Sequence, residues 1–597
     1  ESEHPERKPI ANALDVRTIE EIASLRVIKF MCVFYQKESC RRIVHLARLT
    51  GREDLAKITS ISIRWQNEQT DSVMSVFPVL LAALFAVTTV ERPVSITTNA
   101  QGGVLVDFGR DAYGWLEFVS PVAGAYKLDI GEIVRDGSVW APPITSNIRF
   151  FRLQGRTTPG VFRVPVPVDL RNTGAGAIRL PPELGVVLPF RAVELNHGPF
   201  REATFENIRR VTVRYGYDLS ESSFRCSDPR LERVWGFLKH TVAASTAFGL
   251  FVDGDRERLP YEGDSLATQL ASYAAFSDTE IARATFEHLM DHPTWPTEGK
   301  YCMVMMAWHD WQRTGKTDFA AKWYDRLVAE KLYGEKRRAD GLVVTDVKRD
   351  NPDWPRCERD GYDLRPVNAE VNAYYCHALR LMSELASALG KASDAEAFAA
   401  KAAKTHEAFN AVFSDPSTGL YLDGEGSCHS SLHANALPLA FGLVPEARRD
   451  RVADFVASRS RQCSPYFMLY VLEGLCRAGR VDAAIDYMTS TAANSWMNMI
   501  REGHTTCCET WSIASGSGVV GGAPDLNHPW SCAPASIIPR YVLGVKPAAA
   551  GWTKATVKPS SMFAHANHCR AQRLRKQEIC DQAAAPKTNS VTAYGAF

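Results

Sequence analysis

The segment FVDGDRERLPYEGD, residues 251–264, lies between two stretches whose apolar residues recur at helical spacing. It contains seven acidic or basic side chains, and Gly254, Pro260 and Gly263 would interrupt any helix running through it. We therefore predict a loop held between two packed helices. Carboxylates crowded into such a loop shift one another's pKa values, so one can stay protonated near neutral pH and act as an acid. The alternative is a solvated surface turn with Asp–Arg pairs, the common role of charged loops.

The order of residues in this loop favours the chemical interpretation. The loop resembles the acid loop of the inverting α-L-rhamnosidases, glycoside hydrolase family 78, which reads Asp, a short spacer, Arg or Asp, Glu-Arg-Leu, an aromatic residue and Gly-Asp. The matching positions are Asp253, Arg256, Glu257, Arg258, Leu259, Tyr261, Gly263 and Asp264. Two features depart from the family pattern. Tyr261 stands where many relatives have Trp, a change that preserves stacking on a sugar, and the spacer after Asp253 is shorter.

The resemblance implies roles for the charged residues of this loop. Glu257 would be the general acid that protonates the leaving group. Asp253 and Asp264 would bind hydroxyl groups of rhamnose. Arg256 or Arg258 would fix the loop by ion pairing or contact the sugar directly.

A second segment, REGHTTCCETW at residues 501–511, resembles the family's Gly-x-Thr-Thr-x-x-Glu-x-Trp motif, whose Glu serves as general base. The motif assigns that role to Glu509, while Glu502 lies outside the matching position. The segment that begins at Asn527 resembles the family's His-bearing segment before the last barrel helix, and its His is His528. Together the matches cover roughly residues 100–560.

Four segments between predicted helices combine Trp with acidic residues or His. Sugar recognition needs this combination, because aromatic faces stack on the C–H face of a pyranose and carboxylates accept hydrogen bonds from its hydroxyls. A single Trp is more often a core residue, but the joint pattern favours a binding site. The further substrate-binding candidates are Trp308, Asp353, Trp354, Trp511, His528 and Trp530. By order and spacing, Trp308 and Trp354 fall where the family's sugar-contacting Trp residues lie.

The composition is that of a globular protein, with 597 residues, 45% hydrophobic residues and a net charge of +1. This balance gives no reason to expect nucleic acid or an acidic membrane surface as a partner. The 14 Cys residues lack paired CxxC spacing, and His504 and His528 lack metal-ligand spacing, so we predict no metal site. We also expect no cofactor, since hydrolysis by two carboxyl groups needs none; a structural calcium ion is left open.

The sequence predicts a multidomain chain. Residues 1–91 have no clear structure, 92–222 read as an antiparallel β-sandwich and 544–597 as a short, atypical C-terminal β remnant with a divergent tail. For residues 223–543 the apolar spacing alone predicts a large all-α domain, and the resemblance implies an (α/α)6 barrel. The apolar run at 76–87 is too short to span a bilayer as a helix; its internal position favours buried strands over a secretory signal that would begin at Met74.

The leading functional hypothesis is an inverting glycosidase that removes terminal α-L-rhamnose from a glycoside or polysaccharide. One alternative is a catalytically inactive carbohydrate-binding scaffold; retention of both Glu257 and Glu509 argues against it, since binding alone needs no acid/base pair. Another is a different glycan-cleaving activity on the same barrel, either another deoxy-sugar glycosidase or a lyase. The sequence leaves the linkage, the oligomeric state and the compartment open.

Overall fold

The computed structural model describes residues 86–143, 146–459, 461–513 and 524–560, together with residues 570–571 and 592–593. The interpretations offered for residues 1–85 and for most of 561–597 lie outside these described residues. Within the described part of the chain, no helix is both long enough and apolar enough to cross a membrane.

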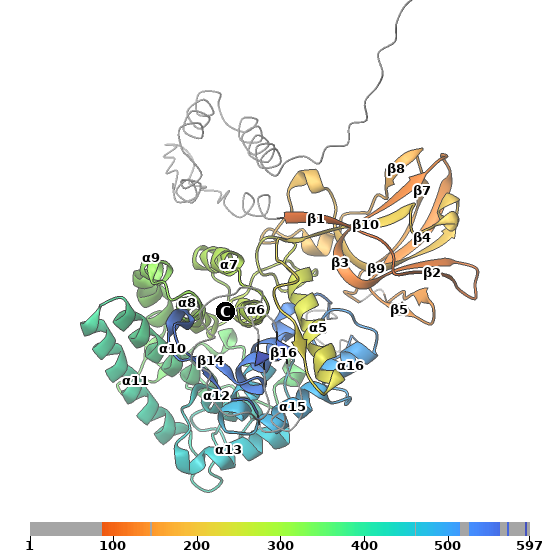
Figure 1. The fold of residues 1–597 in the computed structure, drawn as a ribbon. Coiled ribbons are helices and arrows are strands. Elements are labelled where there is room, and N and C mark those ends of the chain that lie inside the picture. The colour runs from red at the N-terminus through yellow and green to blue at the C-terminus, as the bar shows by residue number, and fades with distance from the viewer. Residues whose placement is uncertain are drawn as a thin grey trace, which may run out of the picture. The chain divides into compact units, whose positions relative to one another are not determined.

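The N-terminal part of the described chain is an eight-stranded antiparallel sheet, drawn in orange in Figure 1. Its strands are β1 (Ala86–Glu91), β2 (Ser95–Thr98), β3 (Val104–Ser120), β4 (Ala125–Gly131), β7 (Phe150–Arg156), β8 (Gly160–Arg163), β9 (Leu188–His197) and β10 (Ile208–Tyr215). The order is β1-β10-β3-β9-β4-β7, and β2 and β8 also pair with β3. Because β1 pairs with β10 along its whole length, the sheet begins before residue 92, where the sequence placed its start.

The long central strand β3 organises this sheet. Its register against β9 shifts between Asp107 and Ala112, where Gly109 has a positive φ of 81°. Such a bulge bends a strand and changes the face to which its side chains point. Most of the strand faces a buried core, to which Val106, Leu116 and Phe118 contribute. Asp111, within the bulge, instead contacts the helical domain.

The helical domain is a ring of six inner helices. They are α6 (Glu262–Ala275), α8 (Gly299–Thr314), α10 (Ala369–Ala388), α12 (Leu432–Phe441), α14 (Met468–Arg477) and α17 (Ala533–Ile537). Each contacts the next in this order, and the ring closes where α17 contacts α6. Outer helices pack against them: α5 (Pro229–Ala244), α7 (Glu280–Asp291), α9 (Asp318–Arg326), α11 (Ala392–Phe413), α13 (Glu446–Arg459) and α15 (Val481–Thr489). This arrangement confirms the (α/α)6 barrel (Figure 1).

The two rings differ in composition as their positions require. All residues of the inner helix α12 are buried, whereas the outer helix α13 buries only Val452, Ala453 and Val456. A helix that is apolar on every side belongs in a core, and one with a narrow apolar stripe belongs at its surface. The alternation of such helices along the chain therefore gives six inner–outer pairs.

The chain breaks between α6 and α7, although the apolar residues of this region recur at helical spacing. The ring of Phe276, at the end of α6, stacks on Tyr217 with a centroid distance of 4.0 Å. The carboxylate of Asp278 then accepts a hydrogen bond of 3.0 Å from the backbone N–H of Glu280 and starts the next helix.

The barrel is followed by a short hairpin of β14 (Val545–Pro547) and β15 (Ala555–Val557). This hairpin agrees with the short C-terminal β segment expected from the sequence. A glycine is required just before it, because Gly544 has a φ of 68° and a Cβ there would lie 1.8 Å from the carbonyl oxygen of Lys558.

Candidate active site

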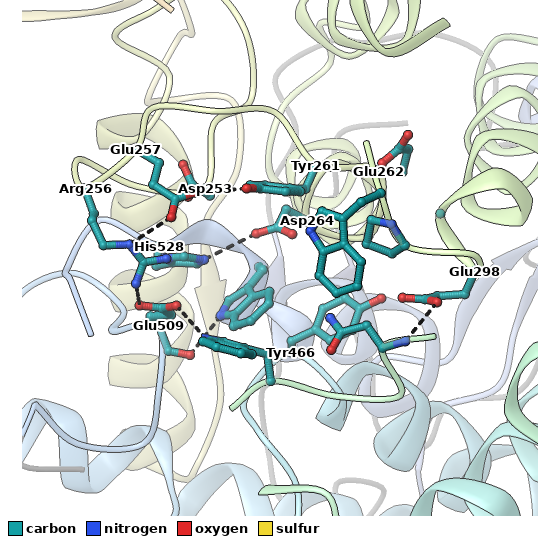
Figure 2. Close-up of a pocket in the computed structure, with 17 residues that line it drawn as sticks. Asp253, Arg256, Glu257, Tyr261, Glu262, Asp264, Glu298, Tyr466, Glu509 and His528 are labelled. Carbon is teal, nitrogen blue, oxygen red and sulfur yellow. Dashed lines mark hydrogen bonds and ion pairs between the residues drawn. The ribbon is translucent and has the colours of Figure 1, made fainter. Parts of the chain in front are cut away.

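A cavity of about 230 Å³ opens at one end of the barrel (Figure 2). It lies at the N-terminal ends of inner helices, since α6 and α8 begin at residues that line it, and α14 and α17 begin two and three residues after the lining residues Tyr466 and Trp530. The lining residues are Asp253, Arg256, Glu257, Tyr261, Glu262, Gly263, Asp264, Trp295, Pro296, Glu298, Gly299, Asn351, Trp354, Tyr466, Glu509, His528 and Trp530. Carboxylates and aromatic rings thus converge on one concave surface, as sugar binding requires.

The charged loop predicted from the sequence joins α5 to α6 and closes on itself. One oxygen of the Asp253 carboxylate accepts hydrogen bonds of 2.9 Å from the backbone N–H groups of both Gly254 and Leu259. The backbone N–H of Asp253 donates to the carbonyl oxygen of Leu259 at 2.8 Å. The Tyr261 hydroxyl donates to Oε2 of Glu257 at 2.9 Å. These contacts turn the side chains of the loop toward the cavity.

Arg256 connects the two glutamates to which the sequence assigned the chemistry. Its Nη1 donates to Oε2 of Glu509 at 2.8 Å, and its Nε lies 3.4 Å from Oε1 of Glu257. Its backbone N–H donates to Oδ2 of Asp525 at 2.9 Å. One guanidinium group therefore holds carboxylates from two segments that are about 250 residues apart in the sequence.

His528 lies between two carboxylates. Its Nδ1 is 2.8 Å from Oδ1 of Asp525, and its Nε2 is 3.3 Å from Oδ1 of Asp264. Burial lowers the pKa of His528, but the hydrogen bonds to Asp264 and Asp525 outweigh it and raise that pKa well above its usual range. His528 is therefore a buried imidazolium at neutral pH, and it fixes the orientation of Asp264 at the cavity wall.

Two indole rings contact Glu509. Trp354 donates its Nε1 hydrogen to Oε1 of Glu509 at 3.1 Å, and Trp530 donates to the backbone carbonyl oxygen of the same residue at 2.9 Å. Trp530 also stacks on Tyr466, with ring centroids 5.1 Å apart. These rings supply flat apolar surfaces on which a pyranose can stack.

Burial raises the pKa values of Glu509 and Asp253 at the cavity. Burial raises the pKa of Glu509, while the charges of Arg256 and His528 oppose the shift. Burial also raises the pKa of Asp253 well above its usual range, again against the charge of His528. Perturbed carboxyls that gather around a cavity are a common property of catalytic sites.

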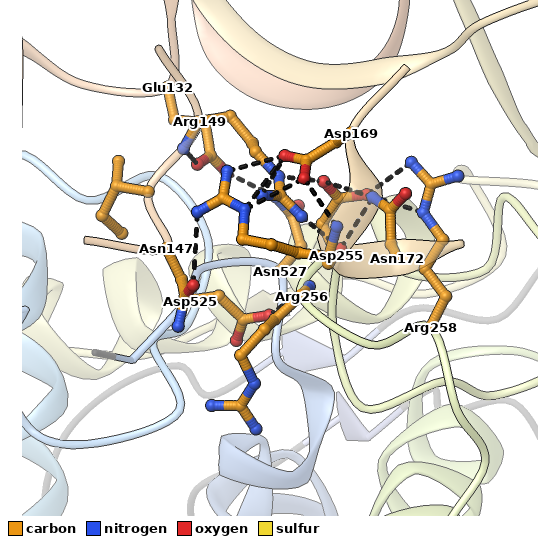
Figure 3. Close-up of polar contacts among 12 residues, drawn as sticks. Glu132, Asn147, Arg149, Asp169, Asn172, Asp255, Arg256, Arg258, Asp525 and Asn527 are labelled. Carbon is orange, nitrogen blue, oxygen red and sulfur yellow. Dashed lines mark hydrogen bonds and ion pairs between the residues drawn. The ribbon is translucent and has the colours of Figure 1, made fainter. Parts of the chain in front are cut away.

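The β domain anchors the charged loop through Asp255 (Figure 3). Arg149, which precedes β7, forms a buried ion pair with the Asp255 carboxylate and also donates to its backbone carbonyl oxygen. Asn172 donates to the same carbonyl oxygen at 3.0 Å. Arg258 donates to Oδ1 of Asp255 at 2.7 Å and to the carbonyl oxygen of Val187 at 3.1 Å. The loop that carries Glu257 is thus held by the β domain.

A second contact from the β domain reaches the His528 segment. Asn527, with a positive φ of 59°, donates its side-chain N–H group to Oδ2 of Asp111 at 2.6 Å and to Oε1 of Glu132 at 3.2 Å. Burial raises the pKa of Asp111 to about 6, and burial beside Asp111 raises that of Glu132 as well. The buried contacts among Asn527, Asp111 and Glu132 join the bulge of β3 to the segment that precedes the last inner helix.

Nine of the residues predicted from the sequence line the cavity: Asp253, Arg256, Glu257, Tyr261, Asp264, Trp354, Glu509, His528 and Trp530. Arg258, Trp308, Asp353 and Trp511 do not. Arg258 has a positive φ of 56° and turns to Asp255 instead of the cavity. Trp308 lies two turns into α8 and donates to Glu384 at 2.8 Å.

The other two residues outside the cavity are buried beneath it. Asp353 accepts hydrogen bonds from the backbone N–H of Ser464 at 2.8 Å and pairs with Nε2 of His433 at 2.9 Å. Trp511 packs edge-on against Trp496, at a centroid distance of 5.1 Å, and its indole donates to a backbone carbonyl. Both residues support the loops that form the wall.

Sequence reasoning missed several residues of the site. Glu262, Trp295, Glu298 and Tyr466 line the cavity, and the buried Asp525 contacts both Arg256 and His528 from behind it. Asp525 stands two residues before the His-bearing segment. This closeness in sequence was a signal that could have identified it. Glu262 lies inside the charged loop at a position that the family pattern leaves unspecified. Trp295, Glu298 and Tyr466 belong to no motif, and only the fold brings them to the same end of the barrel.

Glu509, Asp525 and His528 each offer a potential metal-ligand atom, and these atoms lie within 4.8 Å of one another. They already have protein partners, because Glu509 accepts from Arg256 and the Nδ1 of His528 pairs with Asp525. Arg256 and the charged His528 supply the positive charge that the carboxylates need. We assign no metal to this cluster.

A ring of six helix pairs with a carboxylate-lined cavity at the inner helix ends defines a six-hairpin glycosidase domain. Residues 220–542 match the family model described as the bacterial alpha-L-rhamnosidase 6 hairpin glycosidase domain, and the chain belongs to this family of glycoside hydrolases. The match confirms the resemblance drawn from the charged loop. Among curated proteins, none matches this chain.

Solved structures share the fold at low sequence identity. A GH78 rhamnosidase of Bacillus sp. GL1 is 23% identical, with a TM-score of 0.61 over 81% of this chain and 50% of that one. An alpha-L-rhamnosidase from Dictyoglumus thermophilum is 19% identical, with a TM-score of 0.65 over 81% and 55%. A Klebsiella oxytoca rhamnosidase with rhamnose bound is 16% identical, with a TM-score of 0.58 over 78% and 98%. The chain thus spans about half the length of the first two structures.

We expect Arg149→Met to destabilise the protein by about 3 kcal/mol, because it removes the buried cation that pairs with Oδ2 of Asp255 and leaves only Arg258, on Oδ1. Arg152→Met is the matched control, since Arg152 pairs with Asp129 in the same sheet but is 74% exposed. The Arg152→Met substitution should lower the free energy of unfolding by about 0–1 kcal/mol. Urea unfolding of both variants measures the difference. Equal losses would contradict the anchoring role of Arg149.

Proposed function

We propose that this protein hydrolyses terminal non-reducing α-L-rhamnose from glycosides or polysaccharides with inversion at the anomeric carbon. Glu257 would be the general acid and Glu509 the general base. The observation that carries the proposal is the pair of carboxylates at the cavity, each in contact with the guanidinium of Arg256. Inverting enzymes keep their two carboxyls roughly 6.5–9.5 Å apart. Contacts of 3.4 Å and 2.8 Å to one guanidinium are compatible with a separation in that range.

Solvent exposure supports the assignment of the two roles. The Glu257 side chain is 35% exposed, while that of Glu509 is 3% exposed. The leaving group can be of any size, so the acid that protonates its oxygen has to lie at the mouth of the cavity. The base needs only to hold one water molecule beneath the sugar ring. Glu257 therefore suits the acid and Glu509 the base.

The partners of Glu509 suit a base that works near neutral pH. Two donors, the Arg256 guanidinium and the Trp354 indole, hydrogen-bond to its carboxylate and favour the ionised form. Burial acts in the opposite direction and raises its pKa, which makes the carboxylate a better proton acceptor. An ionised, oriented and basic carboxylate can remove a proton from the attacking water.

The remaining residues of the wall would hold the sugar. The carboxyls of Asp253 and Asp264 can hydrogen-bond its hydroxyl groups, and the rings of Tyr261 and Trp354 can stack on its C–H faces. His528 would keep Asp264 in place. The reaction proposed here uses only two carboxyl groups and water, and it requires no cofactor.

We expect Glu257→Gln and Glu509→Gln to lower kcat on α-L-rhamnosides by roughly 10²–10⁴-fold, the usual contribution of a general acid or base. The acid variant should lose much less on p-nitrophenyl α-L-rhamnopyranoside than on an alkyl rhamnoside, because p-nitrophenolate leaves without protonation. For Glu509→Gln, kcat should fall by the same factor on both substrates. Steady-state rates on the two substrates test this expectation.

Glu502→Gln is the control for this comparison. Glu502 belongs to the same segment as Glu509 but binds Asn498 outside the cavity, so its variant should keep wild-type rates. Wild-type protein that is folded and hydrolyses no rhamnoside would contradict the proposal. If that protein still bound L-rhamnose, the binding scaffold would be the better description.

Inversion predicts which anomer of the product appears first. Proton NMR recorded in the first minutes of hydrolysis should show β-L-rhamnose, followed by slow mutarotation to the equilibrium mixture. The reason is that a single displacement by water reverses the configuration at the anomeric carbon. Initial appearance of the α-anomer would indicate a covalent intermediate and would exclude Glu509 as a base acting on water.

A further inference from the structure

Glu298 lines the cavity but has no role in the chemistry proposed above. It directly precedes α8, and its carboxyl lies on the side of the cavity away from Glu257 and Glu509 (Figure 2). The residue is 6% exposed. A buried carboxyl on a cavity wall is costly unless a partner compensates for its lost hydration.

The protein itself supplies few partners for this carboxyl. Its Oε2 accepts a hydrogen bond from the backbone N–H of Asn351 at 3.3 Å, which is long for a charge-assisted contact. Among the described residues, no lysine or arginine forms an ion pair with Glu298. The neighbouring Glu262 differs, because its carboxylate accepts from both the backbone N–H of Thr294, at 2.9 Å, and the Thr294 hydroxyl. Glu262 is thus occupied, and Glu298 retains hydrogen-bonding capacity.

The surroundings of Glu298 disfavour its charged form. Burial has the largest effect, and it raises the pKa of Glu298 to about 8. The charged and titratable groups around it are Glu262 on α6, Asp350 beside Asn351, Glu370 on α10, Cys302 on α8 and Arg359. Arg359 is the cation among these groups, and its guanidinium is hydrogen-bonded to Asp353 and Asn351. Glu298 therefore carries a proton at neutral pH, and a neutral carboxyl can both donate and accept a hydrogen bond.

We propose that Glu298 determines sugar specificity by hydrogen-bonding the glycone hydroxyl that lies opposite the cleaved bond. The inference rests on the proposed function, since it takes Glu257 as the residue that faces the leaving group. A pyranose held with its anomeric carbon between Glu257 and Glu509 directs the opposite ring position, C4, to the other side of the cavity. Glu298 lies on that side. The C4 hydroxyl thus replaces the hydration that the carboxyl has lost.

This arrangement selects against sugars that lack the hydroxyl. A site built to hydrogen-bond a hydroxyl rejects the deoxy analogue strongly, because the buried protein group is left unpaired. The test is calorimetric binding of L-rhamnose and its 4-deoxy and 2-deoxy analogues. The wild type should prefer L-rhamnose to the 4-deoxy sugar by roughly tenfold, the worth of one well-made hydrogen bond. Glu298→Leu should abolish that preference and leave the discrimination against the 2-deoxy sugar unchanged.

The pH dependence separates this role from a merely structural one. Wild-type affinity for L-rhamnose should fall above about pH 8, as Glu298 loses the proton that it donates. Glu298→Gln keeps a donor and an acceptor in the same shape but does not titrate, so its affinity should not show that fall. Glu384→Gln, on α10 and outside the cavity, should behave like the wild type.

Each outcome distinguishes the inference from the proposed function. A folded Glu298→Leu variant that binds L-rhamnose and still rejects the 4-deoxy sugar would overturn the inference and leave the proposed function intact. A fall in affinity above pH 8 that persists in Glu298→Gln would also overturn it. Wild-type protein that binds none of the three sugars would overturn the proposed function and this inference with it.

Discussion

The site depends on the buried positive charge of Arg256. Its side chain is 15% exposed, and its charge acts on Glu257, Glu509, Asp525 and Asp253. Carboxylates packed so closely could not all be ionised in the absence of a cation, because burial and mutual repulsion would protonate them. Arg256 therefore favours the ionised form of Glu509 and joins the charged loop to the segment that carries Glu509. His528 adds a second positive charge next to the same carboxylates.

The β domain is part of this arrangement and not only a neighbour of it. Asp255 adjoins Arg256 in the sequence, and the contacts that fix Asp255 come from Arg149 and Asn172 of the β domain. Asn527 adjoins His528, and its contacts come from Asp111 and Glu132. The barrel supplies the groups that face the cavity, while the β domain supports the residues next to them. A barrel separated from its β domain would lack both supports.

Sequence reasoning succeeded where local patterns carry information. Helical spacing predicted a large all-α domain, and the family resemblance of the charged loop implied the barrel. The motifs also selected Glu257, Glu509 and His528, which line one cavity. For Arg258 the sequence left two roles open, and the structure shows ion pairing, because its backbone conformation turns it to Asp255 and away from the cavity. Sequence reasoning failed where a position depends on the fold. Glu298 belongs to no motif, and its place in the cavity follows only from the position of α8 in the ring.

The closure of the inner ring by α17 against α6 has a consequence for how the chain folds. These helices are separated by more than 250 residues, and the charged loop and the segment that carries Glu509 lie near the same two ends of the barrel sequence. Contacts between such distant segments carry a large loop-closure entropy and form late. During synthesis, the early helix pairs can pack as they emerge, but the cavity does not exist until the last inner helix arrives. The arrangement of side chains at the cavity thus forms late in folding, and its presence requires a complete barrel.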